Sequence, residues 1–180
     1  MSGAARGAMR ELYSRLPVLG AGRRAAAIRT LAADGGAAAI DALAEAAASH
    51  PEPVDRAACL EALATLGRAG SLPAREAVLR LAVQRDFASA LELALAEAWT
   101  PRDARGQAVF FFLTGQWARY EDVDFDHALI RSAYELAGAD LRARLAAAAR
   151  RSGRMEWLLA AASARAGGAK RASALSPGES

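Results

Sequence analysis

Several residue types that mark other protein classes are scarce or missing in this 180-residue chain. Cysteine occurs once, at Cys59, so the chain can form neither an internal disulfide nor a thiolate zinc cluster. Asparagine is missing, lysine occurs only at Lys170, and isoleucine is confined to positions 28, 40 and 130. Because β-branched and aromatic residues are so few, the composition argues against an all-β fold.

The chain also lacks a long apolar run. The longest one covers only residues 108–113, far short of the ~20 residues that a helix needs to cross a bilayer. Near the start, Arg6, Arg10 and Glu11 interrupt the place where a signal peptide would have its apolar core. We therefore expect no membrane segment and a cytoplasmic location, and a lone cysteine that is buried and inert fits a reducing compartment.

Alanine and arginine dominate what is present. The sequence has 50 alanines and 22 arginines, a skew typical of a GC-rich bacterial genome, and both residues are strong helix formers. With 53% hydrophobic and 24% charged residues, the chain has the composition of a globular protein. The composition therefore predicts an all-α fold.

Apolar residues recur at helical spacing, and Gly, Pro or Asp marks the breaks. We expect Asp55 to be the N-cap of the fourth helix, Thr100 with Pro101 to start the seventh, and Asp124 or Asp126 to cap the eighth. The sixth helix should carry Leu91 and Leu95, and 116–125 should be a connector. The pattern predicts about nine to ten helices, near residues 4–16, 23–33, 37–49, 55–66, 73–83, 86–99, 101–114, 127–136, 140–151 and 155–164.

The predicted helices form pairs that repeat. Leu60 and Leu63 align with Ile28 and Leu31 at a shift of 32 residues, and Val78 aligns with Val109 at a shift of 31. Two-helix units of just over 30 residues are typical of an α-solenoid. We therefore predict a right-handed stack of four to five helix pairs that forms a single domain over residues 1–165, followed by a disordered tail over 166–180.

The most distinctive segment is residues 109–126, VFFFLTGQWARYEDVDFD. Together with Leu141, Arg142 and the GRMEW stretch at 153–157, it is similar to a segment in the HEAT-like helical regions of large bacterial WD-repeat proteins. The similarity covers about residues 106–158, and the paired helices with small contact residues also look like HEAT-type repeats. The resemblance implies an armadillo-like superhelix that acts as a scaffold and binds other proteins.

The acidic part of that segment has partial calcium-site spacing. Asp122, Asp124 and Asp126 match the first three ligand positions of an EF-hand loop, but His127 and Ala133 stand where the loop needs Gly and Glu. We therefore expect no calcium site, and carboxylates that cap the following helix instead.

No catalytic pattern emerges elsewhere. The two histidines, His50 and His127, belong to different predicted units, so neither a His-rich metal site nor a catalytic triad is indicated. The sequence therefore predicts a non-enzymatic protein without a cofactor. A remaining alternative is a helical-repeat enzyme acting on DNA bases, which would need a carboxylate beside aromatic residues in a basic cleft.

Two groups of residues are candidates for binding a protein partner. Trp, Tyr and Arg are the residue types that most often dominate interfaces, and Trp117, Arg119 and Tyr120 lie together. The alternative for these aromatic residues is that they anchor an irregular connector to the core. The second candidate group consists of Arg150, Arg151 and Arg154.

Charge is distributed unevenly around these groups. Residues 119–138 carry a net charge of −3, and residues 139–165 carry +4. A basic face around 142–154 could bind nucleic acid through its phosphates, which is the alternative function. Against it, Arg142 and Arg144 point about 200° apart on a helix, so a solvated face paired with the nearby acids is the simpler interpretation.

Overall fold

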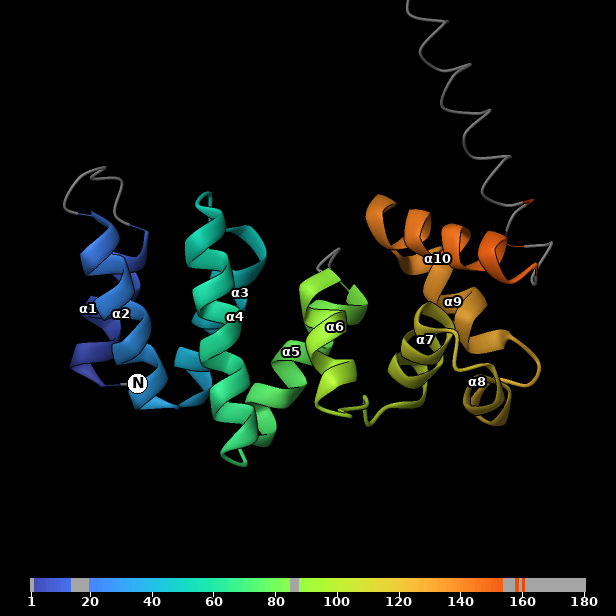
Figure 1. Cartoon of the computed structure of the whole chain (residues 1–180), viewed down its shortest axis with the longest axis horizontal. Helices are drawn as coiled ribbons and strands as arrows, with labels where there is room; N and C mark the ends of the chain where they lie inside the picture. Colours follow the sequence, from blue (N-terminus) through green and yellow to red (C-terminus); the bar gives the residue numbers. More distant parts are fainter. Residues whose placement is uncertain (1, 14–19, 85–87, 154–157, 159, 161–180) are drawn as a thin grey trace, which may run out of the picture. The chain divides into compact units, whose positions relative to one another are not determined.

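A computed structural model describes residues 2–13, 20–84, 88–153, 158 and 160. This part of the chain contains ten α-helices and no strand (Figure 1), which confirms the predicted all-α class. Two compact units, Met1–Pro101 and Arg102–Ser180, are described separately below. The helices are α1 (Gly3–Leu12), α2 (Gly20–Asp34), α3 (Ala37–Ser49), α4 (Pro53–Arg68), α5 (Leu72–Gln84), α6 (Ala88–Ala96), α7 (Ala104–Thr114), α8 (Trp117–Val123), α9 (Ala128–Leu136) and α10 (Ala139–Ser152).

Two predicted segments lie mostly outside the part of the chain that the structure describes. The predicted helix over 155–164 and the tail over 166–180 lie outside the described residues, apart from Leu158 and Ala160. The prediction of a single domain over 1–165 likewise stays a prediction.

The first unit is built from helices joined by short turns. Neighbouring helices pack against each other from α1 through α6, and each of α1, α2 and α3 also packs against the next helix but one (Figure 1). Every helix in the first half of the unit therefore has partners on two sides, which is how an amphipathic helix buries a wide apolar face.

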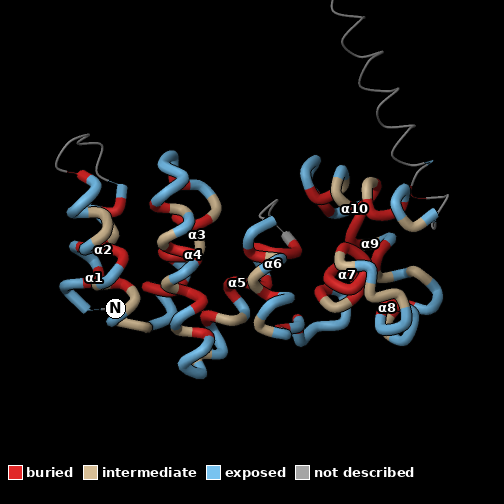
Figure 2. The backbone as a smooth tube through the Cα atoms, viewed as in Figure 1, coloured by how far each residue is buried: buried red, intermediate tan, exposed pale blue. Residues whose placement is uncertain are grey.

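Small residues make up much of the contact surface in this unit. Alanine supplies close to half of all buried apolar residues in the described chain, and in α3 the buried set includes Ala39, Ala46 and Ala47 beside Ile40 and Leu43. In Figure 2 the buried positions alternate with exposed ones along each helix of this unit, as one-sided packing requires. Small side chains let helix axes approach closely, but each one removes little apolar surface from water.

Positive-φ glycines end three helices where the sequence predicted breaks. Gly35, Gly115 and Gly153 have φ values of 59°, 70° and 64°, a region that L-residues with side chains rarely adopt. The bounds predicted for α3 are also confirmed.

Two predicted helix starts are wrong. Asp55 is not the N-cap of α4, because the helix begins two residues earlier at Pro53 and Asp55 lies in its first turn, where it is buried. The N-cap of α7 is Asp103 rather than Thr100, and its carboxylate accepts from the backbone N–H of Gly106 at 2.7 Å. Asp55 instead accepts from Arg24, 31 residues earlier in the chain, whereas Asp103 caps its own helix.

The leucines of α6 do not form its buried face. Leu95 is 45% exposed and Leu91 is only partly buried, whereas Ala90 and Ala94 are fully buried. The buried face of α6, which packs against α5, therefore consists of alanines rather than leucines. The predicted connector 116–125 is likewise corrected, since most of it forms the short helix α8.

Trp99 joins three elements of the first unit. It is buried three residues after the end of α6, and its ring lies against Gly67 of α4. Arg75 of α5 places its guanidinium 5.5 Å from the Trp99 ring centroid and donates from Nε to the carbonyl oxygen of Gly67 at 2.7 Å. A side chain at position 67 would collide with Cη2 of Trp99, so glycine is required at this close approach.

The second unit is organised around α7. Residues 108–113 are all buried, because α8, α9 and α10 each pack against this helix. A helix with partners on several sides needs no polar face, and this explains the continuous apolar run VFFFL at 109–113.

Gly67→Ala should lower the free energy of unfolding. Overpacking against Trp99 costs about 1–3 kcal/mol, which exceeds the ~0.5–1 kcal/mol that alanine gains over glycine within a helix. Gly22→Ala in α2 is the matched control, because nothing lies within 4 Å of its added Cβ; it should stabilise slightly. Urea unfolding followed by circular dichroism measures both, and equal effects would contradict the packing described for Trp99.

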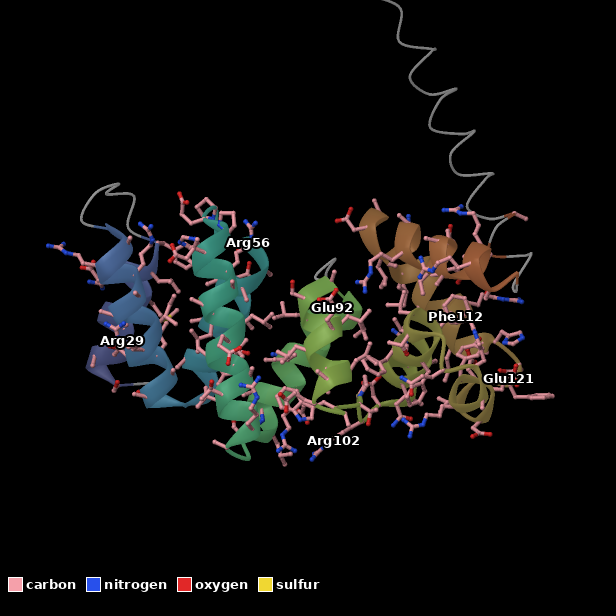
Figure 3. The ribbon with its side chains drawn as sticks, in the orientation of Figure 1. Arg29, Arg56, Glu92, Arg102, Phe112 and Glu121 are labelled. Carbon is pink, nitrogen blue, oxygen red and sulfur yellow. The ribbon has the colours of Figure 1, made fainter. Side chains whose placement is uncertain are left out.

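Phe112→Ala should destabilise the protein by about 3–5 kcal/mol, because the Phe112 ring is fully buried in the second unit (Figure 3). The measurement is the free energy of unfolding in urea. A loss below about 1 kcal/mol, which is usual for surface changes, would show that this ring is not part of a packed core.

Candidate functional site

An aromatic cluster connects α8 to the core of the second unit. The Phe112 ring meets Trp117 and Tyr120 edge-on, with ring centroids 5.2 and 5.4 Å apart, and Trp117 and Tyr120 meet each other at 6.2 Å. Edge-to-face pairs at these distances are favourable beyond the area they bury. The cluster therefore fixes how the short helix α8 sits on α7.

The three aromatic and basic residues predicted to bind a partner differ in accessibility. Tyr120 is 1% exposed, so it belongs to the core, as the alternative interpretation of the sequence held. Trp117 is partly buried, and Arg119 is exposed. The guanidinium of Arg119 lies 5.7 Å from the Phe111 ring centroid and donates to Oε1 of Gln116 at 3.2 Å. A partner can therefore reach Arg119 and one side of Trp117.

The buried hydroxyl of Tyr120 belongs to a polar network. It donates to Oδ2 of Asp124 at 3.1 Å, and its oxygen is 2.9 Å from Nδ1 of His127, whose ring stacks on that of Tyr120. Burial, followed by the Asp124 charge, raises the pKa of Tyr120, so the hydroxyl keeps its proton. Since that single proton goes to Asp124, Nδ1 of His127 carries a proton and donates to the Tyr120 oxygen.

Asp124 is the centre of this network. Its carboxylate is buried and accepts from the backbone N–H groups of Leu129 and Ile130, each at 2.8 Å, as well as from Tyr120. These N–H groups lie in the first turn of α9, where no carbonyl of the helix can satisfy them. The predicted capping role of Asp124 is thus confirmed, although the residue in the N-cap position is His127, with φ 61°.

The turn that Asp124 stabilises presents an unexpected residue. Phe125, next to the buried Asp124, is 86% exposed. Asp126, which follows it, accepts from the backbone N–H of Ala128 at 3.1 Å, and the His127 N–H donates to the Asp124 carbonyl oxygen at 3.1 Å. Sequence analysis missed Phe125 as a surface residue; its position between two aspartates in a polar turn was the available signal.

The arginines of the predicted basic face have different roles in the structure. Arg142 donates to the carbonyl oxygens of Tyr134 and Glu135, at 3.1 and 3.2 Å, and so holds the end of α9. Arg150 and Arg151 are exposed in the last turn of α10, and Arg154 lies outside the described residues. Among the described arginines of this group, the exposed ones are therefore Arg150 and Arg151, at the end of α10.

Two buried ionisable residues of the first unit are structural. His50 is 2% exposed; its Nε2 donates to the Leu12 carbonyl oxygen at 2.9 Å, and its Nδ1 accepts from the Glu52 N–H at 3.1 Å. Cys59 is buried as predicted, and burial, with a smaller effect of the Asp55 charge, raises the pKa of its thiol to about 12. The thiol is therefore a poor nucleophile at neutral pH.

The first unit also has a hollow between α4 and α6. Its volume is about 400 Å³, Leu60 and Leu93 contribute apolar surface, and Arg56 and Glu61 stand among its polar lining residues. Ser89 of α6 adds a hydroxyl group to the same lining.

Among the described residues, no three His, Cys, Asp or Glu side chains lie close enough together to hold a metal ion. In the same part of the chain, no helix is both long and apolar enough to span a bilayer.

Comparison with known proteins adds no relative. The chain matches no protein-family model, no curated protein and no solved structure.

Asp124→Ala should lower the free energy of unfolding by about 2–3 kcal/mol, because it removes a cap and leaves buried donors without an acceptor. Asp122→Ala is the matched control: this carboxylate is exposed two residues away, and its removal should change stability by less than about 0.5 kcal/mol. Urea unfolding checks both variants. Similar effects at the two positions would mean that Asp124 does not hold the turn.

Proposed function

We propose that this chain is a non-enzymatic helical-repeat scaffold that binds another protein, with its helix pairs stacked in a HEAT-like, armadillo-like α-solenoid. The observation that carries the proposal is the packing in the first unit, where α1, α2 and α3 each contact both the next helix and the next but one. Stacked helix pairs create extended surfaces suited to binding proteins. The bacterial cytoplasm is the proposed location, on the grounds of composition.

Exposed apolar side chains support a binding role. Val54 on α4 is 79% exposed, Leu95 on α6 is 45% exposed, and in the second unit Leu136 is 71% exposed. Single exposed apolar residues are common, but an interface needs such residues as anchors. The accessible members of the proposed binding group are Trp117 and Arg119 on α8, with Arg150 and Arg151 at the end of α10.

The alternative proposal is nucleic-acid binding by the end of α10. The exposure of Arg150 and Arg151 favours it, but Arg142 is committed to carbonyl oxygens of α9. Phosphate binding by arginines weakens steeply as salt rises. A titration of random duplex DNA at low and high ionic strength tests this function, and no binding at low ionic strength eliminates it.

Affinity capture from the native cytoplasm, after nuclease treatment, tests the scaffold function. The wild-type chain should retain a defined protein partner, and a variant with Trp117→Ala and Arg119→Glu should lose it. Arg29→Glu, at an exposed arginine of α2 (Figure 3), is the control and should retain the partner. Recovery of nucleic acid alone before nuclease treatment, and of nothing afterwards, would overturn the proposal.

A further inference from the structure

The hollow between α4 and α6 interrupts the packing of alternate helices in the first unit. In this unit α1 packs against α3, α2 against α4, and α3 against α5, but no comparable packing joins α4 to α6 among the described residues. A space of about 400 Å³ lies between these two helices instead, and Figure 1 shows both of them. Its volume is within the range of small-ligand sites, roughly 300–1,000 Å³.

Much of the lining of this hollow is apolar. Leu60 of α4 is its most deeply buried apolar residue, and Leu93 of α6 is half-buried on the other side. Pro53 and Ala57 lie on the same face of α4 as Leu60, at helical spacing, and are exposed to solvent. An aliphatic chain in the hollow would therefore remove apolar surface of both helices from water.

Arg56 lines the same hollow, and the turn before α4 holds its guanidinium in place (Figure 3 labels Arg56). Its Nη1 donates to the carbonyl oxygens of His50 and Pro51, at 2.8 and 3.4 Å. Among the described residues no carboxylate pairs with Arg56, so Nε and Nη2 remain for a ligand. These two donors form a planar fork that matches the two oxygens of a carboxylate. Because the turn already holds the group, a ligand does not have to order a flexible side chain.

The acidic residue of the lining already has a counter-charge. Glu61 pairs with Arg68 at 2.9 Å, and Arg68 also binds Glu97 at 2.7 Å. A ligand with one negative charge therefore meets the guanidinium of Arg56, whereas the second charge of a phosphate monoester would lack a partner in this lining. The apolar surface and the single available cation together favour an aliphatic monocarboxylate.

We propose that the hollow between α4 and α6 binds a medium-chain aliphatic carboxylate. The chain of the ligand lies against Leu60 and Leu93, and its carboxylate accepts hydrogen bonds from Nε and Nη2 of Arg56. The site does not depend on the scaffold function, because no protein partner is needed to form it.

Isothermal titration calorimetry of the full chain with octanoate tests the site. Octanoate carries both the carboxylate and the aliphatic chain, and it should bind at one site per chain. Acetate lacks the chain, octanol lacks the charge, and octylammonium reverses the charge. Each of these three compounds should bind at least about tenfold more weakly than octanoate, since each loses one of the two interactions.

Variants with matched controls locate the ligand. Arg56→Gln should weaken octanoate binding by at least about tenfold, whereas Arg29→Gln, at an exposed arginine of α2 outside the hollow, should not change it. Leu93→Ala should weaken binding several-fold, and Leu95→Ala on the same helix should have no effect. Ala57→Phe places a ring in the hollow from an exposed position and should abolish binding. Circular dichroism confirms that each variant is folded.

A peptide that ends in leucine offers the same carboxylate from a protein chain. It should bind more weakly than octanoate, because its backbone amide would meet the apolar surface of Leu60 and Leu93. Tighter binding of this peptide than of octanoate, lost when its carboxylate is amidated, would make a protein C-terminus the occupant and overturn the proposal. It is equally overturned by a wild-type chain that does not bind octanoate at millimolar concentration, by equal binding of octanol, or by a folded Ala57→Phe variant that binds as the wild type does.

Discussion

Close packing through alanine is the constraint on which the rest of the structure depends. Where contact residues are as small as Ala46 and Ala47 of α3, helix axes must approach closely to exclude water, and each contact contributes little apolar area. The larger buried side chains then become decisive, because they supply area that the alanines lack. Trp99 in the first unit and the aromatic cluster around Phe112 in the second are such anchors.

Because the alanine contacts bury little apolar area, buried polar groups also contribute to the contacts between helices. Arg24 of α2 reaches Asp55 of α4 at 2.5 Å, and His50 binds the Leu12 carbonyl oxygen at the end of α1. Arg24 and Asp55 are 31 residues apart, the spacing at which the apolar pattern repeats. One contact between α2 and α4 is therefore ionic and largely buried, and loss of either partner would leave an unpaired charge in the core.

Sequence reasoning succeeded where local chemistry decides the outcome and failed where packing decides it. The breaks at Gly35, Gly115 and Gly153 follow from backbone geometry that almost only glycine adopts, so they were predictable. The buried face of α6 was not, because Leu95 has helical spacing and is nevertheless 45% exposed, while Ala90 and Ala94 are fully buried. The role of Asp55 was not predictable either, because its ion-pair partner Arg24 is distant in sequence.

The candidate site shows the same contrast between what local chemistry decides and what packing decides. The start of α9 allowed the prediction that a carboxylate caps this helix. The sequence did not show which of the two carboxylates, Asp124 or Asp126, turns inward. The bonds from Asp124 to Leu129 and Ile130 settle this choice. Once Asp124 points inward, the following side chain is directed away from the core, so the exposure of Phe125 is a consequence of helix capping. A buried carboxylate thus accounts for the exposed aromatic side chain of this turn.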